Sequence, residues 1–219
     1  MARSTRLTTV VVAVAVAGAA ALAFGAGCHR KVAPPDPCMA AAALVEVRDR
    51  EGVLELALRP LHGAAIVCDA HGRPLGTFVR VASPPSLVIK NAAGDAEATL
   101  TLARGPNDGA TLNAGATSLR LYEDGSLLRV LDASGVPLGQ VSRDGARALV
   151  FDAAGRALAE ATRADPDGDR RVIRGVDGTV KKLVAGTHDD RAAAAFGLEA
   201  LPLVERLLLS RWLDSNDSR

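Results

Sequence analysis

The feature that most constrains the fold of this chain is a turn motif that recurs between short apolar runs. Each copy places an aspartate or asparagine three residues before a glycine, in the sequences RDREG, CDAHG, KNAAG, LDASG and FDAAG. The side chain of such a residue accepts hydrogen bonds from the backbone that follows it, and glycine supplies the positive φ that closes the turn. Each copy therefore predicts a hairpin turn. The motif residues are Asp49 and Gly52, Asp69 and Gly72, Asn91 and Gly94, Asp132 and Gly135, and Asp152 and Gly155, with tighter pairs at Asp108-Gly109, Asp124-Gly125, Asp144-Gly145 and Asp177-Gly178.

The spacing of these turns predicts an antiparallel meander. Asp49 and Asp69 are 20 residues apart, and so are Asp132 and Asp152, with a second turn halfway in the latter interval. A period of about 20 residues with two turns leaves two strands of about five to seven residues. Alanine-rich helices are excluded, because a glycine or proline interrupts every window long enough to hold one. Ten or more short strands make residues 44–213 a mainly β domain, either a closed barrel or a sandwich.

The chain changes character near its end. From Asp189 the sequence reads DDRAAAAFGLEALPLVERLLLSRWL, which predicts a helix over about residues 190–213, with Pro202 as a place for a kink, followed by a polar tail over residues 214–219. More than half of the helix circumference is apolar, so it must be covered, inside a barrel or against a sandwich. The apolar arc holds Phe196, Ala200, Leu203, Val204, Leu207, Leu208 and Trp212, and the polar arc holds Glu199, Arg206 and Ser210.

The first 27 residues have the pattern of an export signal. A basic start with Arg3 and Arg6 precedes an uncharged run, and small residues stand directly before Cys28. This arrangement resembles the lipobox of bacterial lipoproteins, which implies cleavage, diacylation of Cys28 and a membrane anchor in the cell envelope. A retained transmembrane anchor and plain cleavage are the alternatives. Residues 28–43 are rich in proline and predict a semi-rigid tether. His29, in place of an aspartate, favours the outer membrane by resemblance to lipoproteins sorted between two membranes.

Two further cysteines, Cys38 and Cys68, are expected to pair. In an exported protein two thiols can close into a disulfide, and a loop of about 30 residues contributes about 3 to 4 kcal/mol in the chain-entropy model. Two separate buried thiols are the alternative. The expected bond would pin the tether to the β domain.

The strand-rich region with its final helix resembles the tubby and phospholipid-scramblase superfamily. The segments that carry the resemblance are VCDAHGRPLG (67–76), VLDASGVPLG (130–139), VFDAAGRALA (150–159) and the terminal helix. The resemblance implies a twelve-stranded barrel around a C-terminal helix. No cluster of residues matches the phosphoinositide or calcium sites of that family, so lipid binding is implied by analogy alone.

Few residues suggest chemistry. His29, His62, His71 and His188 stand apart, and no pair has the spacing of metal ligands on one element. Asp165, Asp167 and Asp169 in ADPDGDR form a weak candidate for a calcium loop without the EF-hand spacing, and a solvated turn is the simpler interpretation. Motifs for an activated nucleophile or a phosphate-binding loop do not occur. We expect no cofactor.

The balance of charge excludes some partners. Lysine plus arginine (26) nearly equals aspartate plus glutamate (25), and the charges are interspersed, so the chain lacks the basic patch of a nucleic-acid-binding protein. The sequence thus favours a non-catalytic envelope lipoprotein whose β domain binds a protein, glycan or lipid partner or fills a structural role. The alternative is an enzyme, hydrolase-like, with a site assembled from distant strands. Convergence of His62, His71, His188 and the Asp165–Asp169 loop in one cleft would favour the enzyme.

Overall fold

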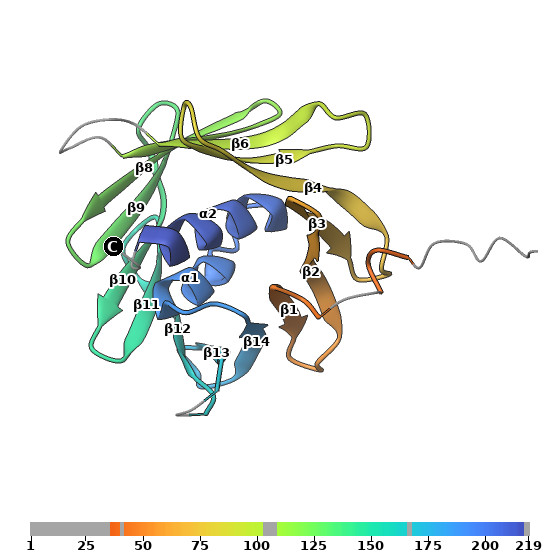
Figure 1. The fold of residues 1–219 in the computed structure, drawn as a ribbon. Helices are drawn as coiled ribbons and strands as arrows, with labels where there is room; N and C mark the ends of the chain where they lie inside the picture. The colour runs from red at the N-terminus through yellow and green to blue at the C-terminus, as the bar shows by residue number, and fades with distance from the viewer. Residues whose placement is uncertain (1–35, 40–41, 103–108, 166–167, 217–219) are drawn as a thin grey trace, which may run out of the picture. The chain divides into compact units, whose positions relative to one another are not determined.

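The computed structural model describes residues 36–39, 42–102, 109–165 and 168–216, and over them the chain forms one antiparallel barrel (Figure 1). Fourteen strands follow one another around it, and β1 pairs with β14 to close it. The predicted mainly β domain is confirmed, and it is a barrel. The strands are β1 (Val45–Asp49), β2 (Leu54–Leu61), β3 (Ala64–Asp69), β4 (Pro74–Val81), β5 (Ser86–Lys90), β6 (Ala96–Leu102), β7 (Ala110–Ala114), β8 (Thr117–Asp124), β9 (Leu127–Asp132), β10 (Pro137–Asp144), β11 (Arg147–Asp152), β12 (Ala157–Arg163), β13 (Arg170–Gly175) and β14 (Val180–Ala185).

Two helices occupy the middle of the barrel. Helix α1 (Asp190–Ala194) continues into a 3-10 turn (Ala195–Gly197), and α2 (Leu203–Asn216) follows. Both lie within the ring of strands (Figure 1), and their buried side chains belong to the same hydrophobic core as the inward-facing residues of the wall. Helix α1 contacts β10 to β13, and α2 contacts β5 and β6. The barrel is therefore filled by its own chain.

The prediction of one helix over about residues 190–213 is wrong in detail. The chain leaves the helical conformation after Gly197 and resumes it after Pro202, because proline has no backbone N–H to continue a helix across its position. A single helical wheel therefore fails: Ser210, placed on the polar arc, is buried, and Ala200, placed on the apolar arc, is exposed. Asp214, expected in a polar tail, is buried near the end of α2. The wall has fourteen strands instead of the twelve that the family resemblance implies.

The turns between strands alternate between the two ends of the barrel, because neighbouring strands are antiparallel. One end, which we call the Asx rim, carries the turns that follow the odd-numbered strands, including all five copies of the aspartate or asparagine motif. In each copy the Oδ1 atom accepts a hydrogen bond from the backbone N–H four residues later, over 2.8 to 3.0 Å. The glycine N–H donates to the backbone carbonyl of the motif's aspartate or asparagine over 3.0 to 3.1 Å. The φ of these glycines lies between 74° and 90°. These five predicted turns are confirmed.

The tighter pairs behave differently. Gly125 and Gly145 close two-residue hairpins at the opposite end, which we call the open rim, and Gly178 closes the last turn of the Asx rim. Gly109 does not have a positive φ; a Cβ there would collide with the carbonyl oxygen of Leu121. Asp108 lies outside the described residues.

Residues 36–39 and 42–44, the N-terminal arm, lie against the outside of the wall. Cys38 and Cys68 form a disulfide, as the sequence predicted, with an S–S distance of 1.97 Å. Together with Ala57 and Ile66 they make a small cluster separate from the main core. Cys68 is the next-to-last residue of β3, so the disulfide holds the start of the arm beside the Asx rim. The arm then reaches β1, where the Leu44 N–H donates to the Leu58 carbonyl over 2.7 Å.

Candidate binding cleft

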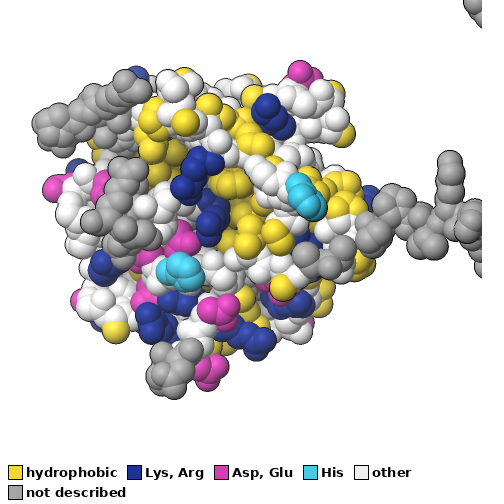
Figure 2. Space-filling model, viewed as in Figure 1, with side chains coloured by type: hydrophobic (Ala, Val, Ile, Leu, Met, Phe, Trp, Pro, Cys, Tyr) yellow, Lys and Arg dark blue, Asp and Glu magenta, His cyan; other side chains and the backbone are white. Residues whose placement is uncertain are grey.

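The open rim carries two adjoining hollows, which share Arg80 and Ser215. It is formed by the turns that follow the even-numbered strands and by the chain that runs from β14 into α1. Over α2, Figure 2 shows hydrophobic side chains beside a group of Lys and Arg side chains at the centre of the molecule's face. We call the two hollows together the rim cleft.

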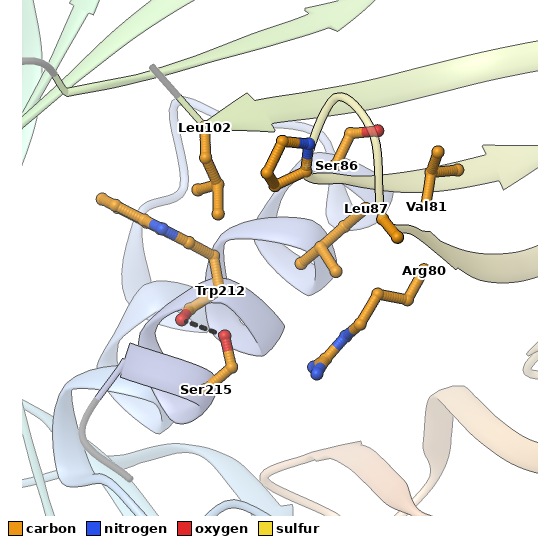
Figure 3. Close-up of a pocket in the computed structure, with 9 residues that line it drawn as sticks. Arg80, Val81, Ser86, Leu87, Leu102, Trp212 and Ser215 are labelled. Carbon is orange, nitrogen blue, oxygen red and sulfur yellow. Dashed lines mark hydrogen bonds between the residues drawn. The ribbon is translucent and has the colours of Figure 1, made fainter. Parts of the chain in front are cut away.

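The first hollow is mainly apolar and has a volume of about 500 Å³. Figure 3 shows Leu87 and Leu102 from the wall and Trp212 from α2 around it, and Arg80 reaching from β4 toward the helix. Among the lining residues that the structure describes, Arg80 is the one with a charge. Its side chain is exposed and makes no ion pair within the described part of the chain. The other lining residues are Val81, Ala82, Pro85, Ser86 and Ser215.

The second hollow is polar and of similar volume, about 500 Å³. Besides Arg80 and Ser215, its lining includes Asp169, His188, Arg211 and Asp214. Arg211 Nη1 donates to Asp214 Oδ2 over 2.9 Å, while Asp214 Oδ1 accepts the backbone N–H groups of His188 (2.6 Å) and Asp189 (3.2 Å). The Asp214 carboxylate thus ties the end of α2 to the start of α1. Its charge is already offset by these donors.

A network of ion pairs lies next to the polar hollow, at the start of α1. Asp189 is the N-cap of α1: its Oδ1 accepts the Arg191 N–H over 2.9 Å and pairs with Arg143 over 2.9 Å. Arg191 reaches Asp189 Oδ2 over 3.2 Å and Glu123 Oε1 over 2.7 Å. Beside it, Arg171 donates to Asp190 Oδ1 over 3.0 Å and to the His188 carbonyl over 2.8 Å. These bonds join β8, β10 and β13 to the start of α1, next to His188 of the polar hollow.

One buried carboxyl lies apart from this network. Glu205, in the first turn of α2, is only 3% exposed, and its Oε2 atom has no hydrogen-bond partner among the described residues. Desolvation by burial raises the pKa of Glu205 above its ordinary value. It does not line the rim cleft.

The structure brings only some of the sequence candidates together. His188 and Asp169 both line the polar hollow. His62 lies in the turn between β2 and β3 on the same rim without lining either hollow, and His71 lies on the Asx rim. His29 and Cys28 lie outside the described residues.

The candidate calcium loop gains no support. Asp165 and Asp169 are exposed in the loop between β12 and β13, and Asp167 lies outside the described residues. Within the ranges that the structure describes, no group of three His, Cys, Asp or Glu side chains is placed to hold a metal ion.

The polar hollow contains a serine, a histidine and an aspartate, but they are not arranged as the catalytic triad of a hydrolase. Ser215, His188 and Asp214 line it, but the Ser215 hydroxyl donates to the Trp212 carbonyl over 2.8 Å. A nucleophilic serine needs a hydrogen bond to its base, with the base oriented in turn by a third group. Asp214 instead binds backbone N–H groups and Arg211. Ser215, His188 and Asp214 therefore do not form such a triad.

Sequence reasoning missed Arg80 and did not place Trp212 in a site. Neither residue belongs to a motif: Arg80 is one of many arginines on strands, and Trp212 was assigned to an apolar helix face. Only the structure shows that the end of β4 and the end of α2 lie at the same rim, where Arg80 and Trp212 line one hollow.

Comparison of the chain with protein-family models, with curated proteins and with solved structures found no match. In the described part of the chain, no helix combines the length and apolar character needed to cross a membrane.

Proposed function

We propose that this chain is an exported, lipid-anchored and non-catalytic binding protein, whose rim cleft takes an apolar molecule that carries one anionic group. The observation that carries the proposal is Arg80, the single charged residue among the described residues that line an otherwise mainly apolar hollow. Sites for small molecules are typically concave and apolar, with a few polar groups that fix orientation. The hollow's volume, about 500 Å³, suits such a ligand.

The filled barrel supports this location. Small barrels that bind ligands often hold them inside the strands, but here the interior is occupied by α1, α2 and their side chains. The rim cleft lies where the wall and α2 meet at the surface. A cation beside low-dielectric walls attracts an anion more strongly than one surrounded by water, and Arg binds a carboxylate through two parallel hydrogen bonds.

Export and anchoring complete the proposal. The leader over residues 1–27 and its resemblance to a lipobox support acylation of Cys28, and the disulfide between Cys38 and Cys68 suits the oxidising compartment outside the cytoplasm. The proposed location is the cell envelope, at the outer membrane, with the membrane as one partner through Cys28. Intact mass spectrometry tests the anchor: a chain that begins at Cys28 and carries a diacylglyceryl group supports it, and loss of that mass in Cys28→Ser is the control.

The chain offers its own reporter for ligand binding. Trp212 is the only tryptophan in the sequence and lines the rim cleft, so intrinsic fluorescence observes the site directly. We expect titration with dodecanoate to change this fluorescence and dodecanol, which lacks the charge, to bind more weakly. An acetylated apolar tripeptide with a free carboxylate, compared with its amide, distinguishes a peptide terminus from a fatty acid as the source of the anionic group.

The variant that tests the site is Arg80→Ala. A charge-assisted hydrogen bond contributes roughly 1.5 to 3 kcal/mol, so we expect a loss of affinity of at least about tenfold. Arg129→Ala removes an exposed arginine from the outer surface of β9 and serves as the matched control, which should bind as the parent does. Equal affinity of the Arg80→Ala variant and the parent, or no response to any of the four probes, would contradict the proposal.

A further inference from the structure

The Asx rim carries exposed apolar side chains on three neighbouring turns. Leu75 (41% exposed) is the second residue of β4, close to the turn between β3 and β4, Val53 (58%) lies between β1 and β2, and Val176 (74%) lies between β13 and β14. These turns are neighbours because β1 pairs with both β2 and β14, and β2 pairs with β3. Met39 (72% exposed) stands beside the first of them, since a Cβ on Gly72 would lie 3.1 Å from its Cε atom. We call Met39, Val53, Leu75 and Val176 the apolar arc.

The chain enters the barrel at the same place. The disulfide to Cys68 fixes Cys38 next to the turn that begins at Asp69, so the arm starts beside the apolar arc. Asp36, the first described residue, stands eight positions after Cys28. At about 3.3 to 3.6 Å per residue, a fully extended segment of that length spans at most about 29 Å. A lipid on Cys28 would hold this part of the Asx rim within that distance of the bilayer.

We propose that the apolar arc rests on the membrane surface, so that the rim cleft at the other end of the barrel faces the aqueous compartment. This inference rests on the proposed acylation of Cys28. Four single side chains bury little area, but a short tether replaces a bimolecular association with an intramolecular one at high effective concentration. Two cations near the arc are already paired, Arg50 with Glu51 and Arg73 with Asp69, and Asp177 beside Val176 accepts hydrogen bonds from the Thr179 N–H and hydroxyl. The proposed contact therefore rests on the apolar side chains rather than on electrostatic attraction. The same barrel without its lipid should not bind vesicles.

The test uses the full acylated chain in vesicles of phosphatidylethanolamine and phosphatidylglycerol. With Cys28 acylated and Cys38 bonded to Cys68, an added cysteine is the only free thiol, so one fluorophore can be attached at Val176→Cys and, in a second protein, at Leu61→Cys. Leu61 ends β2 on the open rim and is 43% exposed. A lipid with a nitroxide on its headgroup then quenches whichever fluorophore lies at the membrane. We expect quenching at residue 176 to be several-fold stronger than at residue 61.

Two further variants test the arc itself. Val53→Asp combined with Leu75→Asp should reduce quenching at residue 176 to the value at residue 61. Val136→Asp is the matched control: Val136 is 55% exposed on the same rim, but its turn between β9 and β10 lies outside the arc, so quenching should persist.

The outcomes separate the two proposals. Equal quenching at residues 176 and 61 in a chain that floats with the vesicles would overturn the docking and leave the anchor intact. Stronger quenching at residue 61 would place the rim cleft on the membrane and also overturn it. A chain that carries no lipid by mass spectrometry and does not float would overturn the anchor, and the docking with it.

Discussion

The two rims of the barrel are built in opposite ways. On the Asx rim, five turns repeat one geometry, and every bond that defines a turn joins residues no more than four apart, as in Asp152 with Ala154 and Arg156. On the open rim, the bonds that hold the structure join distant residues: Arg191 to Glu123 is a separation of 68, and His188 to Asp214 is a separation of 26.

The electrostatic environments differ as well. The Arg156–Asp152 pair of the Asx rim lies in water, with 80% and 18% of the two side chains exposed, whereas the Arg191–Asp189 pair is 6% and 2% exposed. Exposed pairs contribute little to stability, and loss of one partner of a buried pair leaves an uncompensated charge. The Asx rim is therefore a set of independent closures, while the open rim is one cooperative unit that supports the rim cleft.

Removing one cation from each rim should give the largest contrast. Arg191→Met leaves Glu123 without this partner and weakens the cap of α1 at Asp189, so we expect the free energy of unfolding to fall by about 3 to 5 kcal/mol. Arg156→Met, the same substitution on the Asx rim, should leave it almost unchanged. Urea unfolding followed by circular dichroism measures both. Similar losses for the two variants would mean that the rims are not energetically distinct.

This contrast explains which parts of the fold could be predicted from sequence. The turn at Asp69 can be predicted from sequence because the accepting side chain, the donating N–H groups and the glycine all lie within five consecutive residues. The mainly β class and the expectation of ten or more strands follow from the repetition of such turns, but the number fourteen does not. The ion pair between Asp189 and Arg143 has no comparable local signal, because the two residues meet only in the folded barrel.

Two glycines with nearly the same φ sharpen the comparison. Gly155 on the Asx rim has φ of 78° with open space where a Cβ would stand, and Gly186 on the open rim has φ of 80° with the Leu44 carbonyl oxygen in that space. Gly155→Ala should cost about 1 to 2 kcal/mol for the left-handed conformation alone. Gly186→Ala adds overpacking against the start of β1, for a total of about 3 kcal/mol. Equal urea concentrations at the unfolding midpoints of the two variants would show that the backbone at Leu44 can move away from the added methyl group at no measurable cost.

Glu205 provides a titration from the interior of the barrel. Since its folded pKa is raised, the folded state binds a proton more readily than the unfolded state, and stability falls as pH rises above the ordinary carboxyl pKa. Glu205→Gln removes the ionisation at nearly constant volume. We expect the variant to be more stable than the parent at pH 8, with the difference vanishing below about pH 4. Parallel stability curves across that range would contradict the assigned burial.

The interior also shows what sequence reasoning could not supply. A helical wheel assumes one continuous helix, and the break from Leu198 to Pro202 reverses the chain, so the positions of Ser210 and Ala200 were assigned to the wrong environments. The site depends on the same reversal: it returns α2 to the open rim and brings Trp212 to Leu102 and Arg80. The sequence around Arg80 or Trp212 contains no information about their placement in one hollow.

Three aspartates of the Asx rim, Asp69, Asp132 and Asp152, should titrate in the opposite sense to Glu205. Hydrogen bonds to the charged form lower the pKa of Asp69 and Asp152, chiefly from the backbone N–H groups of Arg73 and Arg156, and that of Asp132, chiefly from the Ser134 hydroxyl. A lowered folded pKa contributes stability that is present above the ordinary carboxyl pKa and is lost as pH falls through the folded value.

The turn at Asn91 is a natural control for these three turns, because an amide stands there in place of the carboxylate. Asn91 makes the equivalent bonds to the Ala93 and Asp95 N–H groups, over 2.9 and 3.0 Å, with a side chain that does not titrate. We therefore expect the combined Asp69→Asn, Asp132→Asn and Asp152→Asn variant to have nearly the parent's thermal midpoint at pH 7 and a smaller loss of stability below about pH 4. A large drop at pH 7 would mean that these turns need the carboxylate charge, which would make the Asx rim as dependent on ionised side chains as the open rim is.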